Sequence, residues 1–131
     1  MNLLLIDTNI VIDALKKRRG RAEYLESLAL HGFTLSLCAI VLAELYTGMS
    51  QADIYKAEGM TRDFVFLATN AELARLAGTL RKRHRDRGIA LSVPDCLIAA
   101  IAIHYNVMLV TDNQKDFPMP ELQFYPLPAT L

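Results

Sequence analysis

The sequence predicts an α/β fold in which a central parallel sheet is flanked by helices on both faces. Two observations support this. Short apolar runs of strand length alternate along the chain with longer stretches of helical periodicity. The strand-like runs are apolar throughout, as expected where both faces of a parallel sheet are buried. With a length of 131 residues, we expect a single domain over residues 1–131.

The first half of the chain alternates between buried-strand patterns and short helices. Glycines mark two helix ends, because Gly32 follows one helical stretch and Gly48 interrupts the next. Strands are expected at residues 3–6, 33–38 and 63–67, and helices at residues 9–17, 21–31, 40–49 and 52–61.

The second half contains two clearer helices. Asn70 suits the N-cap of a long helix over residues 71–87, and Gly88 suits its end. Pro94 suits the first turn of the next helix, whose body is apolar on all sides and should be buried against the sheet. The remaining expected segments are a fourth strand at residues 107–110, a fifth at 123–125, and a proline-rich tail, 117–128, lying over the surface.

Composition argues against several classes of protein. Cys38 and Cys96 lie far apart in apolar runs, so we interpret both as buried thiols of a reduced, cytoplasmic protein without a zinc site. The longest apolar run, residues 96–103, is too short to cross a membrane. The three histidines are interpreted as surface or helix-face residues: His31, His84 and His104.

The net charge is zero, but the basic residues are concentrated in two patches. Such patches can attract a polyanion locally, or they can be solvated helix ends and faces, since Lys and Arg favour helix C-termini. The first patch contains Lys16, Lys17, Arg18, Arg19 and Arg21, and the second contains Arg81, Lys82, Arg83, Arg85 and Arg87.

Carboxylates stand where strands of the expected sheet end. Asp7 directly follows the first strand and Asp112 follows the fourth, and ligands of open parallel sheets bind beyond this edge. Asp95 opens the buried helix, so it should face the same edge. Each of these residues could simply cap a helix or turn. Glu44 is different, because a carboxylate beside an apolar stripe costs free energy unless it is paired or binds a cation.

Taken together, the carboxylates predict a divalent metal site. Acids that converge without basic partners repel one another and stay ionised only around a positive charge. Oxygen ligands without sulfur or imidazole favour Mg²⁺ or Mn²⁺. Such an ion can polarise a phosphate and activate a bound water, and basic patches would suit a nucleic acid backbone.

Four segments, in this order and spacing, resemble the PIN-domain ribonucleases. They are LLIDTNIVID around Asp7, AIVLAELYTG around Glu44, SVPDCLIAAIAI around Asp95, and LVTDNQKDF near the C-terminus. More narrowly, they resemble the VapC toxins of bacterial toxin–antitoxin pairs, including the FitB-like branch. The resemblance implies a PIN-like sheet of strand order 3-2-1-4-5 and endonucleolytic cleavage of RNA, through a water activated by Mg²⁺ or Mn²⁺.

The resemblance also implies roles for individual residues. Asp7 and Asp95 match the principal metal ligands of the family, and Glu44 matches the acid that completes the cluster. The family's NxxDF motif is present over residues 113–117, which favours Asp116 over Asp112 as the fourth acid. The expected catalytic and metal-binding set is Asp7, Glu44, Asp95 and Asp116, with support from Thr8, Thr111, Asp112 and Asn113.

Partners follow from the same resemblance. A VapB-like antitoxin would wrap the toxin and block the acidic cleft, and any contact with DNA would be indirect, through that antitoxin. We also expect a homodimer, an RNA substrate held by the second basic patch, and no membrane. The alternative is a non-catalytic regulatory protein that acts on DNA with its antitoxin. A candidate antitoxin surface, which could equally be core, contains Tyr46, Met49, Ile54, Tyr55 and Met60.

Overall fold

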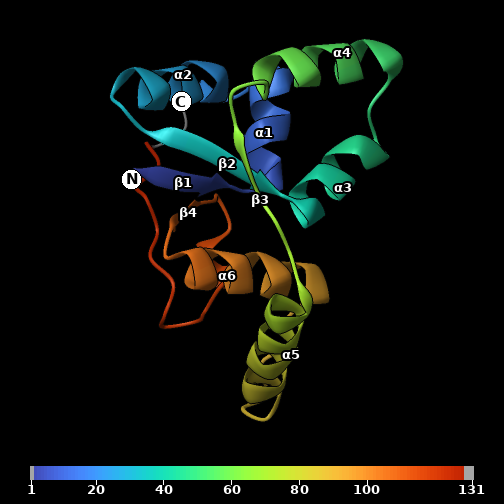
Figure 1. The fold of residues 1–131 in the computed structure, drawn as a ribbon, viewed down its shortest axis with the longest axis vertical. Helices are drawn as coiled ribbons and strands as arrows, with labels where there is room; N and C mark the ends of the chain where they lie inside the picture. The colour runs from blue at the N-terminus through green and yellow to red at the C-terminus, as the bar shows by residue number, and fades with distance from the viewer. Residues whose placement is uncertain (1, 129–131) are drawn as a thin grey trace.

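The structure is a computed structural model that describes residues 2–128 and has the expected α/β architecture (Figure 1). Its sheet contains four strands, all parallel, in the order β3-β2-β1-β4. These strands are β1 (Leu3–Ile6), β2 (Thr34–Cys38), β3 (Val65–Leu67) and β4 (Met108–Val110).

Local signals in the sequence set most of the helix boundaries. The Asn70 side chain accepts a hydrogen bond from the Leu73 N–H at 2.9 Å, as expected of an N-cap. Gly88, after the same helix, has a φ of +80° that suits glycine. The helices are α1 (Thr8–Leu15), α2 (Arg21–Leu30), α3 (Ala39–Thr47), α4 (Gln51–Met60), α5 (Ala71–Arg85), α6 (Val93–Tyr105) and the short 3₁₀ helix η1 (Gln114–Asp116).

The helices cover both sides of the sheet. In Figure 1, α1 to α4 lie on one side and α5 and α6 on the other. This division follows from right-handed crossovers, because the path along the sheet reverses after β3, when the chain returns to place β4 beside β1. The inner strand β1 is covered on both faces, with Leu5 and Ile6 both at 0% exposure. This burial fixes the point at which the chain leaves β1.

The fifth strand expected at residues 123–125 is reduced to a single bridge. The expected strand order 3-2-1-4-5 is therefore wrong in its last member, and the sheet ends at β4. A single parallel bridge joins Leu109 to Phe124. The Leu109 N–H donates to the Gln123 carbonyl at 2.9 Å, and the Tyr125 N–H donates to the Leu109 carbonyl at 3.0 Å. Pro126 follows directly and has no N–H to continue the ladder.

The proline-rich tail is also more deeply packed than expected. Phe117 and Met119 are each 2% exposed, so this part of the tail belongs to the core. The interpretation of His84 as a surface or helix-face residue is wrong, since it is 4% exposed and points inward beneath this tail. Its ring nitrogens lie 2.8 Å from the Leu80 carbonyl oxygen and 3.4 Å from that of Pro118. The other two histidines are exposed, as expected.

Both cysteines are buried and free. Burial raises the pKa of the Cys38 thiol and of the Cys96 thiol, which disfavours their reactive thiolate forms. Among the residues that the structure describes, there is no helix with the length and apolar character needed to cross a membrane.

Candidate active site

Asp7 leaves the carboxyl end of the central strand and is 7% exposed. Its backbone N–H donates to the Val110 carbonyl at 3.0 Å, which ties it to the neighbouring strand. One carboxylate oxygen, Oδ1, accepts from the Thr8 N–H at 2.8 Å, so Asp7 does cap α1. The other, Oδ2, accepts from the Thr111 hydroxyl at 2.7 Å. Hydrogen bonds from the ends of two adjacent strands therefore fix this carboxylate.

Thr111 is the second part of this arrangement. It directly follows β4 and is 2% exposed. Its hydroxyl oxygen accepts a hydrogen bond from the Asn113 N–H at 3.0 Å, while the hydroxyl donates a hydrogen bond to Asp7. The backbone turn after β4 thus holds the Thr111 hydroxyl in its donating orientation.

Glu44 joins the site from α3. Its Oε1 accepts a hydrogen bond from the Thr8 hydroxyl at 2.8 Å. Glu44 is more exposed than the sequence suggests, and within residues 2–128 it forms no ion pair. A neutral hydroxyl orients the carboxylate and leaves its charge uncompensated.

Asp95 enters from the first turn of α6. The Ser92 side chain caps this helix by accepting from the Asp95 N–H at 3.1 Å, and Pro94 occupies the first turn. The expected helix start is confirmed. The cap fixes the backbone of Asp95, whose side chain then lines the same cavity as Asp7.

Asp116 is positioned by the short helix η1. Its N–H donates to the Asn113 carbonyl at 2.9 Å, which closes the turn and brings both side chains to one wall. Phe117, next in the chain, is 2% exposed and anchors the turn in the core. The NxxDF motif therefore acts as a compact turn with a buried aromatic anchor.

These side chains enclose a cavity of about 350 Å³, here called the acidic cavity. Four of its lining residues are carboxylates, and none is Lys or Arg. The complete lining is Asp7, Thr8, Asn9, Ile12, Glu44, Asp95, Asn113, Asp116 and Phe117.

The carboxylates of the acidic cavity are in an unfavourable electrostatic environment. Burial raises the pKa of Asp7 above its usual 3.8, hydrogen bonds from Thr111 and Thr8 partly oppose this, and the charges of Asp95 and Glu44 raise it further. Burial likewise raises the pKa of Asp95, assisted by the charges of Asp116 and Glu44. A bound cation would relieve both effects.

The donor set fits a hard divalent cation in chemistry, since it offers carboxylate oxygens, an amide and hydroxyls without sulfur or imidazole. It is not a preformed coordination shell. Over residues 2–128, no three His, Cys, Asp or Glu side chains already converge as a metal-binding group. A site for Mg²⁺ does not require such a shell, because this ion typically retains several waters and binds through one or two carboxylates.

Asp112 lies outside the acidic cavity. Its Oδ1 accepts from Arg21 at 2.8 Å, and its Oδ2 accepts from Arg19 at 2.9 Å. Arg21 is 2% exposed, so the interpretation of the first basic patch as a solvated helix end does not hold for this residue. No signal in the sequence predicts these pairs, because Asp112 lies 93 residues from Arg19 and 91 residues from Arg21.

The second basic patch is on the surface and does not line the acidic cavity. All five of its members are exposed, and none lines that cavity. Arg83 forms an ion pair with Glu121 at 2.8 Å, and the Arg81 Nε donates to the Leu91 carbonyl at 2.9 Å. Asn9 also lines the acidic cavity, although it was not among the predicted site residues; its position two residues after Asp7 was a signal in the sequence for it.

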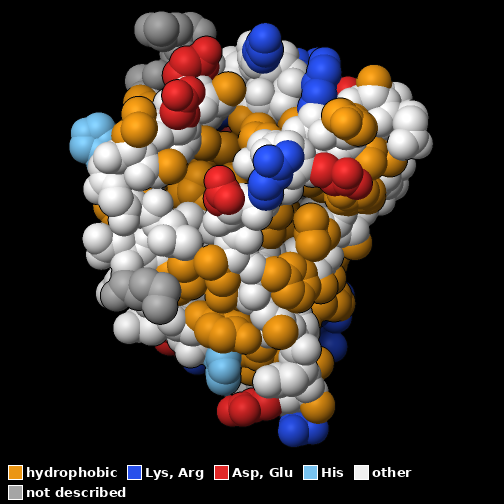
Figure 2. Space-filling view, turned by 45° about the horizontal axis from the view of Figure 1, so that its top comes forward, with side chains coloured by type: hydrophobic (Ala, Val, Ile, Leu, Met, Phe, Trp, Pro, Cys, Tyr) orange, Lys and Arg blue, Asp and Glu red, His pale blue; other side chains and the backbone are white. Residues whose placement is uncertain are grey.

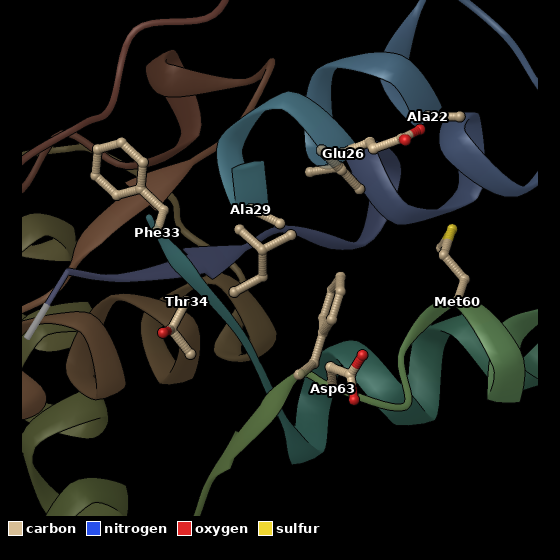
Figure 3. Close-up of a pocket in the computed structure, with 10 residues that line it drawn as sticks. Ala22, Glu26, Ala29, Phe33, Thr34, Met60 and Asp63 are labelled. Carbon is tan, nitrogen blue, oxygen red and sulfur yellow. The ribbon is translucent and has the colours of Figure 1, made fainter. Parts of the chain in front are cut away.

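A larger cavity, of about 550 Å³, lies between α2, β2 and the segment after α4. Figure 3 shows Ala22, Glu26 and Ala29 of α2 facing Met60 and Asp63 across it. Its lining is mostly apolar, with the two carboxylates near its edge. Figure 2 shows hydrophobic side chains gathered over the middle of the face that it displays. This larger cavity, here called the apolar cavity, lacks a cluster of acids or other reactive groups.

The sequence pattern of the PIN domain family matches residues 4–119. Ribonuclease VapC19 of Mycobacterium tuberculosis is 32% identical over 120 residues, which is 91% of this chain and 96% of that protein. The chain belongs to the PIN domain family, in its VapC group. The resemblance carried by the four motifs is therefore confirmed.

Solved structures agree with this assignment of the PIN domain. One similar structure is that of VapBC2 from Rickettsia felis bound to a DNA fragment from the promoter. A chain of it matches with a TM-score of 0.81 and 28% identity, over 94% of this chain and 97% of that one. FitAcB from Neisseria gonorrhoeae gives a TM-score of 0.69 at 20% identity over 93% and 96% of the two chains. The second likeness concerns the fold alone.

Proposed function

We propose that this PIN domain is a divalent-metal-dependent endoribonuclease and the toxin of a VapBC-type toxin–antitoxin pair. The observation that carries the catalytic part is the acidic cavity, where four carboxylates meet at the carboxyl edge of the sheet without a counter-charge. Relatives named Ribonuclease VapC support the reaction class. The alternative, a non-catalytic regulator that acts on DNA with an antitoxin, does not account for an intact acid cluster.

In this proposal Asp7 and Asp95 hold Mg²⁺ or Mn²⁺, and Glu44 and Asp116 complete the acidic wall. When bound, such an ion supplies a Lewis acid for the phosphate and lowers the pKa of a coordinated water. Thr111 and Thr8 keep the carboxylates oriented through the hydrogen bonds described above. No histidine lines the acidic cavity, so its carboxylates are the groups available to hold a proton. We expect products with 5′-phosphate and 3′-hydroxyl ends.

RNA cleavage by the purified chain tests this function. We expect cleavage with Mg²⁺ or Mn²⁺, no cleavage with EDTA, and none by Asp7→Asn at any metal concentration. Asp86→Asn is the matched control, because Asp86 is exposed and lies outside the acidic cavity. Metal-dependent cleavage by pure, folded Asp7→Asn protein would refute the proposal.

We further propose that a VapB-like antitoxin docks on the surface around α4, with any DNA contact made by that antitoxin. Tyr55 is 81% exposed and Tyr46 is 41% exposed, which favours a docking role over a core role for these two residues. Met60, half-buried, lines the apolar cavity (Figure 3). The Rickettsia felis neighbour is a VapBC complex bound to promoter DNA.

Co-expression with the product of an adjacent short reading frame tests the partner. Tyr55→Ser should weaken the complex about tenfold or more, since exposed aromatic residues often dominate interfaces. Leu30→Ser is the matched control, because Leu30 is 80% exposed and lies on α2. Equal affinities of the two variants would argue against this surface. Light scattering of the chain alone would test the proposed homodimer.

A further inference from the structure

A second cavity adjoins the acidic cavity and carries the opposite charge. Its volume is about 430 Å³. Three of its lining side chains are cationic and one is a carboxylate, so we call it the basic cavity. Its lining is Arg19, Arg21, Thr111, Asp112, Gln114, Lys115, Leu127 and Pro128.

The segment of residues 111–116 forms the wall between the two cavities. Asn113 lines the acidic cavity, whereas Lys115 lines the basic one. Thr111 lines the basic cavity and also donates its hydroxyl hydrogen bond to Asp7 at 2.7 Å. A ligand in the basic cavity would therefore lie one residue away from the principal carboxylate of the acidic cavity.

Arg19 has an unusual backbone conformation at the edge of the basic cavity. Its φ is +56°, in the left-handed region that side chains other than glycine rarely adopt. Its guanidinium lies 2.9 Å from Asp112 and 3.6 Å from Asp13, and its side chain is 42% exposed. Lys17 has a similar φ of +52°, so this conformation belongs to the loop between α1 and α2. Arg19 is thus fixed at one end of its side chain while remaining accessible to a ligand.

Arg21 adds a buried positive charge. Its side chain is 2% exposed, one Nη lies 2.8 Å from Asp112, and its buried Nε has no hydrogen-bond partner among residues 2–128. It also occupies the first position of α2, where Gly20 provides no side-chain cap and the helix dipole adds positive potential. Asp112 pairs with both guanidinium groups, and Asp13 also lies 3.6 Å from that of Arg19.

Lys115 contributes a third cation. It is exposed, and within residues 2–128 it takes part in no ion pair. The basic cavity as a whole has more positive than negative charge, and the excess is on accessible side chains. Guanidinium and ammonium groups in this arrangement favour a phosphate, because both donate charge-assisted hydrogen bonds to its oxygens.

The acidic cavity needs such a neighbour if it is to act on RNA. Even with a divalent ion bound, four carboxylates leave the acidic cavity with a net negative charge, so cations close by would add affinity for the strand. The second basic patch lines neither cavity. We propose that the basic cavity binds a backbone phosphate of the RNA, adjacent to the phosphate presented to the acidic cavity. This inference rests on the proposed function and deepens it by naming the residues that position the strand.

Two substitutions test the basic cavity. Arg19→Gly removes a guanidinium and suits the left-handed backbone, and Lys115→Ala removes an exposed charge. Binding of a short, fluorescent single-stranded RNA is measured over a series of salt concentrations, with Asp7→Asn present in every protein. We expect each substitution to weaken binding about three- to tenfold at low salt and to reduce the salt slope by about 0.7, the value for one phosphate contact.

Arg18→Ala is the matched control, since Arg18 is exposed in the same loop and lines neither cavity. It should leave the salt slope unchanged. An unchanged slope for both test variants would overturn the inference. Weaker antitoxin binding with unaltered RNA binding would also overturn it, by assigning the basic cavity to a protein partner. RNA binding and RNA cleavage are measured separately. Absence of cleavage by the wild type would refute the proposed function, whereas the inference about the basic cavity is judged by the salt slope of binding alone.

Discussion

Asp112 and Asp116 lie in one short segment, yet their surroundings are opposite. Asp112 is neutralised by two guanidinium groups at 2.8 and 2.9 Å. Asp116 shares the acidic cavity with three other carboxylates and with no Lys or Arg. Pairing explains Asp112 as a structural residue that holds the start of α2 against the end of β4. The uncompensated charge around Asp116 is the charge that the proposed divalent ion would balance.

Asp7→Asn should have the largest effect of the substitutions that distinguish the acidic cavity from the paired Asp112. Removing one negative charge from the acidic cavity should abolish detectable RNA cleavage, a loss of about a thousandfold or more, because a principal ligand is lost. The fold should remain intact, since the amide oxygen can still accept from the Thr8 N–H, while the amide NH2 can donate to the Thr111 hydroxyl oxygen once that hydroxyl rotates. Cleavage rates and circular dichroism measure the two effects. Unfolding of the variant would instead make Asp7 a structural residue like Asp112.

Asp112→Asn should have the opposite pattern. It leaves the buried Arg21 charge uncompensated, so we expect a loss of about 3 kcal/mol in the free energy of unfolding. Asp13→Asn is the control, with an expected loss below about 1 kcal/mol, because Asp13 is 3.6 Å from the half-exposed Arg19. Urea denaturation measures both. Equal losses in the two variants would contradict the role given to Asp112.

Thr111→Val should have an intermediate effect. It removes the hydroxyl that holds Asp7 Oδ2, so we expect about tenfold slower cleavage and a loss of about 1 kcal/mol of stability. Because this hydrogen bond lowers the pKa of Asp7, its removal should move the acid limb of the cleavage profile to higher pH. Thr111→Ser retains the hydroxyl and should behave as the wild type. An unmoved acid limb in the valine variant would separate Thr111 from catalysis.

The smallest effect concerns the stability of the metal-free chain. Burial raises the pKa of Asp7 above 3.8, so its contribution to stability is fully present below that pH and is lost as pH rises through the raised value. In EDTA, the wild type should therefore lose stability relative to Asp7→Asn as pH rises. Saturating Mg²⁺ should reverse the order of the two proteins, because the ion stabilises the folded state to which it binds. Thermal unfolding of both proteins with and without Mg²⁺ measures this order. An unchanged order in Mg²⁺ would argue against metal binding at Asp7.

Much of the fold and part of the candidate site could be predicted from local signals in the sequence. The uniformly apolar β1 predicted a buried strand, and its burial determines where Asp7 emerges. Asn70, Ser92 and Pro94 mark helix starts by hydrogen bonding and backbone geometry that act within a few residues. Such signals do not depend on the distant parts of the chain.

The features that could not be predicted depend on long-range packing. Arg21 follows a run of charged residues and reads as solvated, but its burial depends on Asp112 from the other end of the chain. His84 lies in a basic stretch, and its burial depends on the tail at Pro118. The bridge at Phe124 stops where Pro126 interrupts pairing, which limited the fifth strand. In each case a contact far away in sequence outweighs the local pattern.

Anomalous diffraction from crystals grown with Mn²⁺ would locate the proposed ion directly. We predict an anomalous peak in the acidic cavity, bounded by Asp7, Glu44, Asp95 and Asp116, and none beside Asp112. Asp7→Asn crystals under the same conditions should lose the peak. A peak at Asp112, or an acidic cavity without manganese at saturating concentration, would show that these four carboxylates are not the metal site.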